Sequence, residues 1–180
     1  MEGDIIGNTP VGFGRAVRSG FVPLETAYLA LGSNLGDRRR HLDAAVSAVV
    51  ALPGVAGLRL SRVRETAPVG PQDQGAFLNA AAEIQTTLSP TALLAALLAI
   101  EARLGRPARA DRRHWGPREI DLDLLLHGEQ ILDGEGLTLP HPRLHERRFV
   151  LDPLGDLAAG LVVPGLNQTV AGLLATLPTP

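Results

Sequence analysis

Two aspartates stand at alternate positions in the segment "PREIDLDLLLHG", residues 117–128. Asp121 and Asp123 interrupt a run of Ile and Leu that is typical of a buried strand. Since successive side chains of a strand point to opposite faces, both carboxylates lie on one face, about 7 Å apart along the backbone. Neighbouring carboxylates repel one another unless a cation lies between them, and oxygen ligands without Cys favour Mg²⁺ over zinc. A solvated sheet face is the simpler alternative, and the pair alone does not exclude it.

Arginines are concentrated just before this pair. Guanidinium groups bind phosphate oxygens at two points and offset the charge that develops during phosphoryl transfer. One or two of these arginines can belong to a solvated loop, but the group as a whole predicts a site for a magnesium-bound polyphosphate. Residues 103–118 contain six of them: Arg103, Arg106, Arg109, Arg112, Arg113 and Arg118.

Aromatic residues make up only 3% of the chain. Phe77 precedes Asn79 by two positions, so on a strand the ring and the carboxamide share a face. Such a pair can hold a flat polar heterocycle by stacking and by hydrogen bonds to its edge. Trp115 lies among the arginines, which is an unusual place for core packing. For Phe77 and Phe149 taken alone, packing in the core is the simpler role.

The elements that must position these residues predict an α+β, ferredoxin-like fold. Apolar spacing, caps and turns give the order β-α-β-β-α-β, with helices on one face of an antiparallel sheet. A hairpin at 129–139 and a helix at 167–177 are predicted as short C-terminal additions. The predicted main elements are strand 27–31, a helix from Asp37 to Pro53, strands 58–63 and 77–88, a helix from Ser89 to Gly105, and strand 117–128.

In the last of these strands, the side chains that alternate with the aspartates are expected to pack against the helices. They are Ile120, Leu122, Leu124 and Leu126. Residues 1–25 show no clear period and are interpreted as an N-terminal extension, a candidate for disorder, outside a single domain at 26–180.

Composition excludes several classes of function. All 17 basic residues are arginine, so neither a lysine Schiff base nor a Walker-type phosphate loop can form. Cys is absent, which removes disulfides, thiol nucleophiles and thiolate metal sites. A net charge of −2 points to neither nucleic acid nor a membrane surface as partner. The longest apolar run, 92–100, is too short to span a bilayer, and no signal peptide is evident, so a cytoplasmic location is expected.

Four segments together resemble the 6-hydroxymethyl-7,8-dihydropterin pyrophosphokinase family of folate biosynthesis. They are "AYLALGSNLGD", "ETAPVGPQDQGAFLNAA", "HWGPREIDLDLLLHG" and "LPHPRLHERRFVLDPL", and the resemblance runs from about Ala27 to Leu177. It implies the same ferredoxin-like fold and the transfer of diphosphate from ATP to the hydroxymethyl group of a reduced pterin, releasing AMP. It also implies two Mg²⁺ ions as cofactors, and a monomer suits the size of the chain.

Taken position by position, the resemblance implies three sets of site residues. Asp121 and Asp123 would hold the metal ions and, with Arg118 and Arg106, form the catalytic set. The pterin would contact Thr66, Ala67, Val69, Phe77, Asn79, Trp115 and Phe149. ATP would contact Glu101, Arg113, Trp115, Arg118, Leu124, Thr138, His141 and Arg147.

Three alternatives remain open at this stage. Ferredoxin-like sheets also serve RNA-binding modules, although the acidic residues of this sheet face would repel a phosphate backbone. Another Mg²⁺-dependent phosphotransferase or nucleotidyltransferase would fit the same residues and would release ADP or pyrophosphate instead of AMP. A non-catalytic homologue is disfavoured because both aspartates are present.

Overall fold

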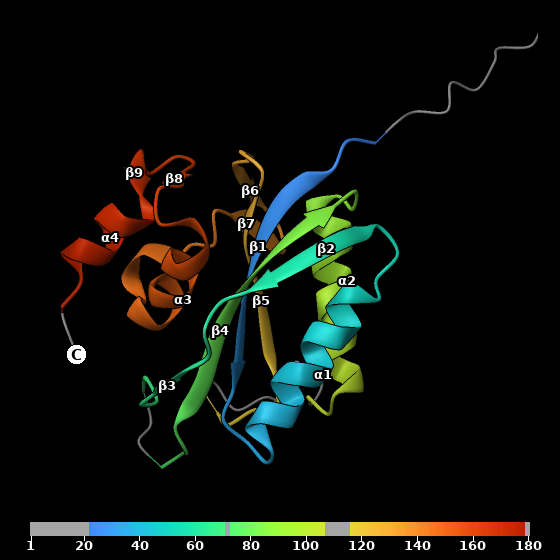
Figure 1. Cartoon of the computed structure of the whole chain (residues 1–180), viewed down its shortest axis with the longest axis vertical. Helices are drawn as coiled ribbons and strands as arrows, with labels where there is room; N and C mark the ends of the chain where they lie inside the picture. Colours follow the sequence, from blue (N-terminus) through green and yellow to red (C-terminus); the bar gives the residue numbers. More distant parts are fainter. Residues whose placement is uncertain (1–21, 71–72, 107–115, 179–180) are drawn as a thin grey trace, which may run out of the picture.

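A computed structural model describes residues 22–70, 73–106 and 116–178. At its centre lies an antiparallel sheet in the order β2-β4-β1-β5, with the short β3 paired to β4 (Figure 1). The elements follow the predicted order β-α-β-β-α-β, except that the short β3 is inserted between β2 and β4 and that further elements come after β5. The sheet and its two connecting helices are β1 (Glu25–Ser33), α1 (Arg38–Val50), β2 (Val55–Leu60), β3 (Arg64–Thr66), β4 (Phe77–Thr86), α2 (Pro90–Arg103) and β5 (Asp121–His127).

Helices cover both faces of the sheet. α1 and α2 lie on one side in Figure 1, and their starts are capped as the sequence predicts: Asp37 accepts a hydrogen bond from Arg40 N, and Ser89 from Ala92 N. On the other side lie α3 and α4. The elements after β5 are β6 (Leu132–Gly134), β7 (Leu137–Leu139), the 3-10 turn η2 (Leu144–Glu146), α3 (Arg148–Ala158), β8 (Val162–Val163), β9 (Gln168–Thr169) and α4 (Val170–Thr176).

The ferredoxin-like prediction is therefore confirmed, and α3 is an addition that the sequence did not reveal. Pro153 lies inside this helix, where proline is normally disfavoured beyond the first turn. The predicted strand 58–63 is wrong in its bounds, since β2 runs from Val55 to Leu60 and a separate β3 follows. The interpretation of 1–25 as an extension concerns mainly residues outside the described part, although β1 already begins at Glu25.

One core prediction for β5 is also wrong. Leu122 and Leu124 pack with the helices α1 and α2 as expected, but Leu126 belongs to the hydrophobic cluster on the α3 side. The pairing of β5 with β1 shifts register between Tyr28 and Leu29, which is a bulge that takes up one extra residue. Beyond the bulge the alternation of faces is displaced, so Leu126 turns toward α3.

β5 is the edge strand of the sheet, and two of its outward backbone groups are bonded to other elements. Leu122 N donates to Glu101 Oε1 at 2.7 Å, and Leu125 O accepts from His141 N at 2.9 Å. Glu101 is 1% exposed at the end of α2, so a buried carboxylate fixes the strand directly beside Asp121. Within the described residues, no helix is long and apolar enough to cross a membrane.

Candidate active site

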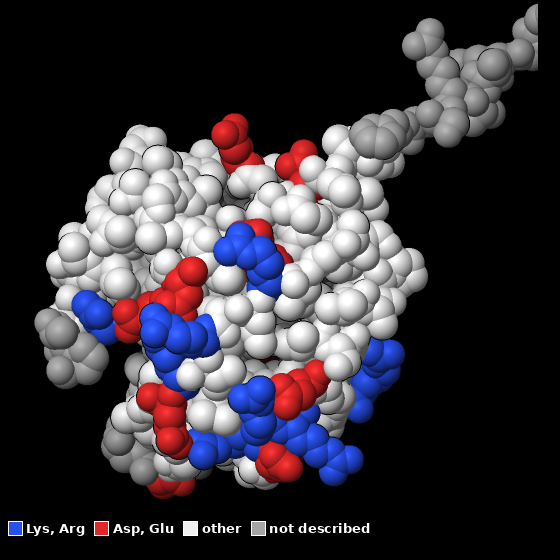
Figure 2. Space-filling view, in the orientation of Figure 1, with Lys and Arg blue, Asp and Glu red and all other residues white. Residues whose placement is uncertain are grey.

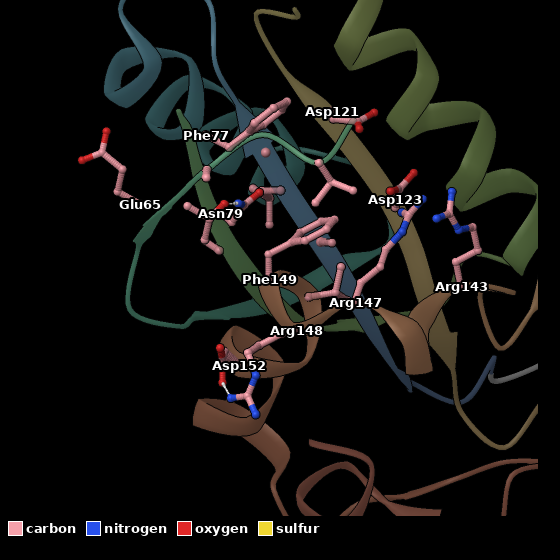
Figure 3. A pocket seen from close by; sticks show the side chains of 18 of the residues that line it. Glu65, Phe77, Asn79, Asp121, Asp123, Arg143, Arg147, Arg148, Phe149 and Asp152 are labelled. Atoms are coloured by element: carbon pink, nitrogen blue, oxygen red, sulfur yellow. Dashed lines mark hydrogen bonds and ion pairs between the residues drawn. The ribbon is translucent and has the colours of Figure 1, made fainter. Parts of the chain in front are cut away.

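A cavity of about 660 Å³ lies between the sheet and α3. Its floor is formed by β1, β4 and β5, and its walls by β3 with the residues after it and by the segment from η2 into α3. Figure 3 shows that Asp121 and Asp123 lie at one end, while Phe77, Asn79 and Phe149 surround the middle. The carboxylates and the aromatic rings that the sequence singles out thus face one cavity.

The two aspartates have different electrostatic surroundings. Asp121 is held between two arginines: its Oδ1 lies 2.5 Å from Arg106 NH1, and its Oδ2 lies 2.7 Å from Arg118 NH1. Arg106 also pairs with Glu101, so this guanidinium joins the end of α2 to β5. Asp123 has no hydrogen bond or ion pair within the described part of the chain, although the charges of Arg147 and, more weakly, Arg106 act on it (Figure 3).

Partial burial in the cavity wall and the charge of Asp121 raise the pKa of Asp123 to about 7, although Arg147 opposes this shift. Ionisation of Asp123 beside a second carboxylate costs free energy, and a divalent cation bound between the two would stabilise the ionised form. The described residues contain no group of three or more His, Cys, Asp or Glu that could hold a metal ion. Asp121 and Asp123 could supply two carboxylates, and Mg²⁺ is usually held by one or two carboxylates when substrate phosphates and water complete its shell.

Removal of divalent cations is expected to make folding stability depend on pH through Asp123. Between pH 3.8, its ordinary pKa, and about 7, the folded protein keeps a proton that the unfolded chain loses, so stability falls as the pH rises. In EDTA, Asp123→Asn should therefore raise the midpoint of thermal unfolding by at least about 3 °C at pH 8, and by much less at pH 5. Thermal unfolding followed by circular dichroism measures both values.

Because other groups titrate too, the informative quantity is the difference between wild type and variant. Added Mg²⁺ should raise the wild-type midpoint at pH 8 and leave that of Asp123→Asn nearly unchanged. Equal midpoints for the two proteins at both pH values would contradict a buried, repelled carboxylate at this position.

Two aromatic rings and a carboxamide line the middle of the cavity. Phe77 and Phe149 approach it from different sides, and Asn79 lies between them on β4 (Figure 3). Asn79 is 6% exposed, and its Nδ2 donates to Thr66 Oγ1 at 2.7 Å, which fixes the carboxamide. A Cβ added at Gly32 would lie 3.0 Å from Asn79 Oδ1 and 3.9 Å from Asp121 Cβ. Glycine at this position therefore leaves room on the cavity floor between the two side chains.

Each aromatic ring is in contact with an arginine of the site. The guanidinium carbon of Arg118 is 5.8 Å from the ring centre of Phe77, and that of Arg147 is 5.7 Å from the ring centre of Phe149. These are cation–π distances. The groups suited to phosphate and the groups suited to a heterocycle are therefore packed against each other.

Asn34, in the turn after β1, ties two cavity-forming segments together. Its Oδ1 accepts from Arg118 N at 2.8 Å, and its Nδ2 donates to Gln74 Oε1 at 3.0 Å and to Gly75 O at 3.3 Å. The start of β5 and the approach to β4 are thus fixed to the same buried side chain.

The predicted site residues fall into three groups. Five do not line the cavity: Glu101, Arg106, Leu124, Thr138 and His141. Arg113 and Trp115 lie outside the described residues, as do Arg109 and Arg112. The residues that do line the cavity are Thr66, Ala67, Val69, Phe77, Asn79, Arg118, Asp121, Asp123, Arg147 and Phe149.

Among the predicted residues that do not line the cavity, His141 is hydrogen-bonded to Arg143, which does line it. Its Nδ1 accepts a hydrogen bond from Arg143 N at 3.2 Å, which places the ring proton on the other nitrogen. Burial, together with the charge of Arg147, lowers the pKa of His141, so the imidazole is neutral near pH 7. Leu124 is 3% exposed in the core and can offer only backbone atoms.

Sequence reasoning missed five charged residues that line the cavity. Most of them follow His141 in the chain and lie on or next to η2 and α3. The sequence indicates these only by their position in the segment "LPHPRLHERRFVLDPL". The five residues are Glu65, Arg143, Glu146, Arg148 and Asp152.

These features define a class of protein: a ferredoxin-like α+β fold with a cavity on its sheet that is lined by aromatic rings, arginines and aspartates. The family model of 7,8-dihydro-6-hydroxymethylpterin-pyrophosphokinase (HPPK) matches residues 28–159. The chain belongs to the HPPK family.

Relatives and solved structures agree with this assignment. A 2-amino-4-hydroxy-6-hydroxymethyldihydropteridine pyrophosphokinase of Haemophilus influenzae is 45% identical over 83% of this chain and 91% of its own length. The protein of the same name from Bacillus subtilis is 46% identical over 73% and 77%. The crystal structure of wild-type Plasmodium falciparum HPPK-DHPS with pteroate has a TM-score of 0.65 at 15% identity. The similarity covers 84% of this chain but 42% of that longer one, and it supports the fold.

Proposed function

We propose that the chain transfers diphosphate from ATP to the hydroxymethyl group of 6-hydroxymethyl-7,8-dihydropterin, giving AMP and the pterin diphosphate in folate biosynthesis. The names of the relatives support this reaction. The observation that carries it in this chain is the single cavity in which facing aromatic rings adjoin two aspartates and two arginines.

The pterin would lie between Phe77 and Phe149, where both ring faces can stack. The carboxamide of Asn79, fixed by Thr66, would bond the polar edge of the heterocycle and set its orientation. With the ring held in this way, its substituent can be directed toward the aspartates, and this fixed orientation lowers the entropic barrier to reaction.

The ATP phosphates would be bound at the other end. Arg118 and Arg147 line the cavity there, and their guanidinium groups would bind phosphate oxygens and offset negative charge during the transfer. Asp121 and Asp123 would hold two Mg²⁺ ions, which would neutralise phosphate charge and help to align the reacting groups. Arg118 would also keep Phe77 in place, because it contacts both that ring and Asp121.

Product analysis tests this proposal. The protein mixed with Mg²⁺, ATP and the pterin is expected to form AMP and the pterin diphosphate in equal amounts, resolved by chromatography. Omission of the pterin should stop AMP formation. EDTA should also stop it, and excess Mg²⁺ should restore it. ADP or free pyrophosphate as the pterin-dependent product would replace this reaction by single phosphate or nucleotidyl transfer.

RNA binding on the sheet is the less supported alternative. α3 packs against β4 and β1, so the sheet face that RNA-binding modules expose is covered in this fold. Figure 2 shows one face of the molecule, on which the described acidic and basic side chains are interspersed rather than gathered into a basic surface. We also propose that the enzyme is a cytoplasmic monomer, since its co-substrate is ATP and a monomer suits a chain of this size.

A further inference from the structure

Asp156 on α3 binds two arginines from the segment that leads into β3. Its carboxylate is bidentate with Arg64, at 2.5 Å (NH1 to Oδ2) and 2.9 Å (NH2 to Oδ1). Arg62 adds a contact of 2.9 Å from NH2 to Oδ1 and a backbone hydrogen bond from N to Oδ2 at 3.2 Å. The hydrogen bonds from Arg64 and Arg62 hold the pKa of Asp156 well below its usual range, so it stays ionised.

Arg64 is the partner that matters most for position. The side chain of Arg62 is 81% exposed, and solvent screens its interaction, whereas that of Arg64 is 27% exposed and that of Asp156 is 15% exposed. Two parallel N–H···O bonds between a guanidinium and a carboxylate also fix the relative orientation of the groups that carry them.

This contact joins two opposite walls of the cavity. β3 has three residues, and among the described strands it pairs with β4 alone; it also contacts α3. Thr66 at the end of β3 lines the cavity two residues after Arg64. On α3, Phe149 and Asp156 are seven positions apart, which places them on one side of the helix. Neither Arg64 nor Asp156 lines the cavity.

We propose that Asp156, acting through Arg64, is a positioning residue that sets the separation of Thr66 and Phe149 and thereby the affinity for the pterin. The inference rests on the proposed function. The ion pair between Asp156 and Arg64 is called the clamp. Asp121 and Asp123 are carried by β5 at the other end of the cavity, so the clamp is expected to act on the heterocycle more strongly than on the phosphate end, although Arg147 of that end directly precedes α3.

The test compares the KM for the pterin with the KM for ATP and with kcat. Asp156→Asn is expected to raise the KM for the pterin about tenfold, with the KM for ATP and kcat within about twofold of wild type. Arg64→Met should do the same, and the double variant should be no worse than Asp156→Asn alone. Glu83→Gln is the matched control: the Glu83 side chain is also 15% exposed and is paired with Arg59, but it joins β4 to β2 and does not line the cavity.

A titration of the pterin followed by fluorescence gives the dissociation constant without turnover. If Asp156→Asn or Arg64→Met weakens pterin binding about tenfold and Glu83→Gln does not, the positioning role of Asp156 is supported. This holds even if wild type forms no AMP, because the absence of AMP would refute the proposed function and not the positioning role. If Asp156→Asn does not fold, Arg64→Met decides. Unchanged pterin affinity in folded variants, or equal losses for pterin and ATP, overturns the inference, as does a wild type that binds no pterin.

Discussion

Asp123→Asn is expected to reduce pterin-dependent AMP formation by at least about a thousandfold. The substitution keeps the shape of the side chain and removes the negative charge that faces the cavity next to Asp121. Without that charge the site would lose one of the two carboxylates proposed to hold Mg²⁺ at the phosphate end. Initial rates at saturating ATP, pterin and Mg²⁺ measure the effect, and the loss should appear in kcat.

The same variant is expected to be more stable than wild type in EDTA at pH 8, so its inactivity cannot be attributed to unfolding. Asp43→Asn serves as a control, because Asp43 is an exposed carboxylate paired with Arg39 on α1 and does not line the cavity. It should retain wild-type rates. Turnover of Asp123→Asn within about tenfold of wild type would contradict the assignment of Asp123 to the metal site.

Phe149→Ala is expected to raise the KM for the pterin about 10- to 100-fold. Stacking of a heterocycle on an aromatic side chain is worth about 1–3 kcal/mol, and alanine leaves one face of the pterin without a partner. Loss of the ring also removes the surface on which Arg147 rests, so a smaller fall in kcat is expected. Steady-state kinetics with the pterin varied at saturating ATP provide the measurement.

Phe149→Tyr is the control for this prediction. It keeps an aromatic face at the same position and should remain within about threefold of wild type in KM. If alanine and tyrosine had the same effect, the ring would be acting through packing around α3 and not through the pterin. The KM for ATP should change less than the KM for the pterin in either variant, since the proposed phosphate ligands lie on other residues.

The main elements of the fold could be predicted because local signals agree with the tertiary structure. The caps at Asp37 and Ser89 mark both connecting helices. On β5, alternation predicts the common face of Asp121 and Asp123, and the structure places both in the cavity wall. These features depend on neighbours a few residues away, which a sequence displays directly.

Other features depend on contacts between distant segments. The bulge that turns Leu126 toward α3 is visible only in the pairing of β5 with β1. α3 was hidden by Pro153, and with it the charged wall formed by Arg148 and Asp152. The ion pair between Asp156 and Arg64 joins residues that are 92 positions apart in the sequence, and no local pattern indicates such a partner.

The edge position of β5 has a consequence for assembly. The exposed N–H and C=O groups of an edge strand are a template on which another molecule can add a strand, which is a common start of aggregation. Here the outward groups of Leu122 and Leu125 are already bonded to Glu101 and to the backbone of His141. An incoming strand would have to break the hydrogen bond between Leu122 N and a buried carboxylate, which costs free energy because a buried polar group loses a partner. The strand that bears the two aspartates is thereby protected from self-association and remains available to small ligands.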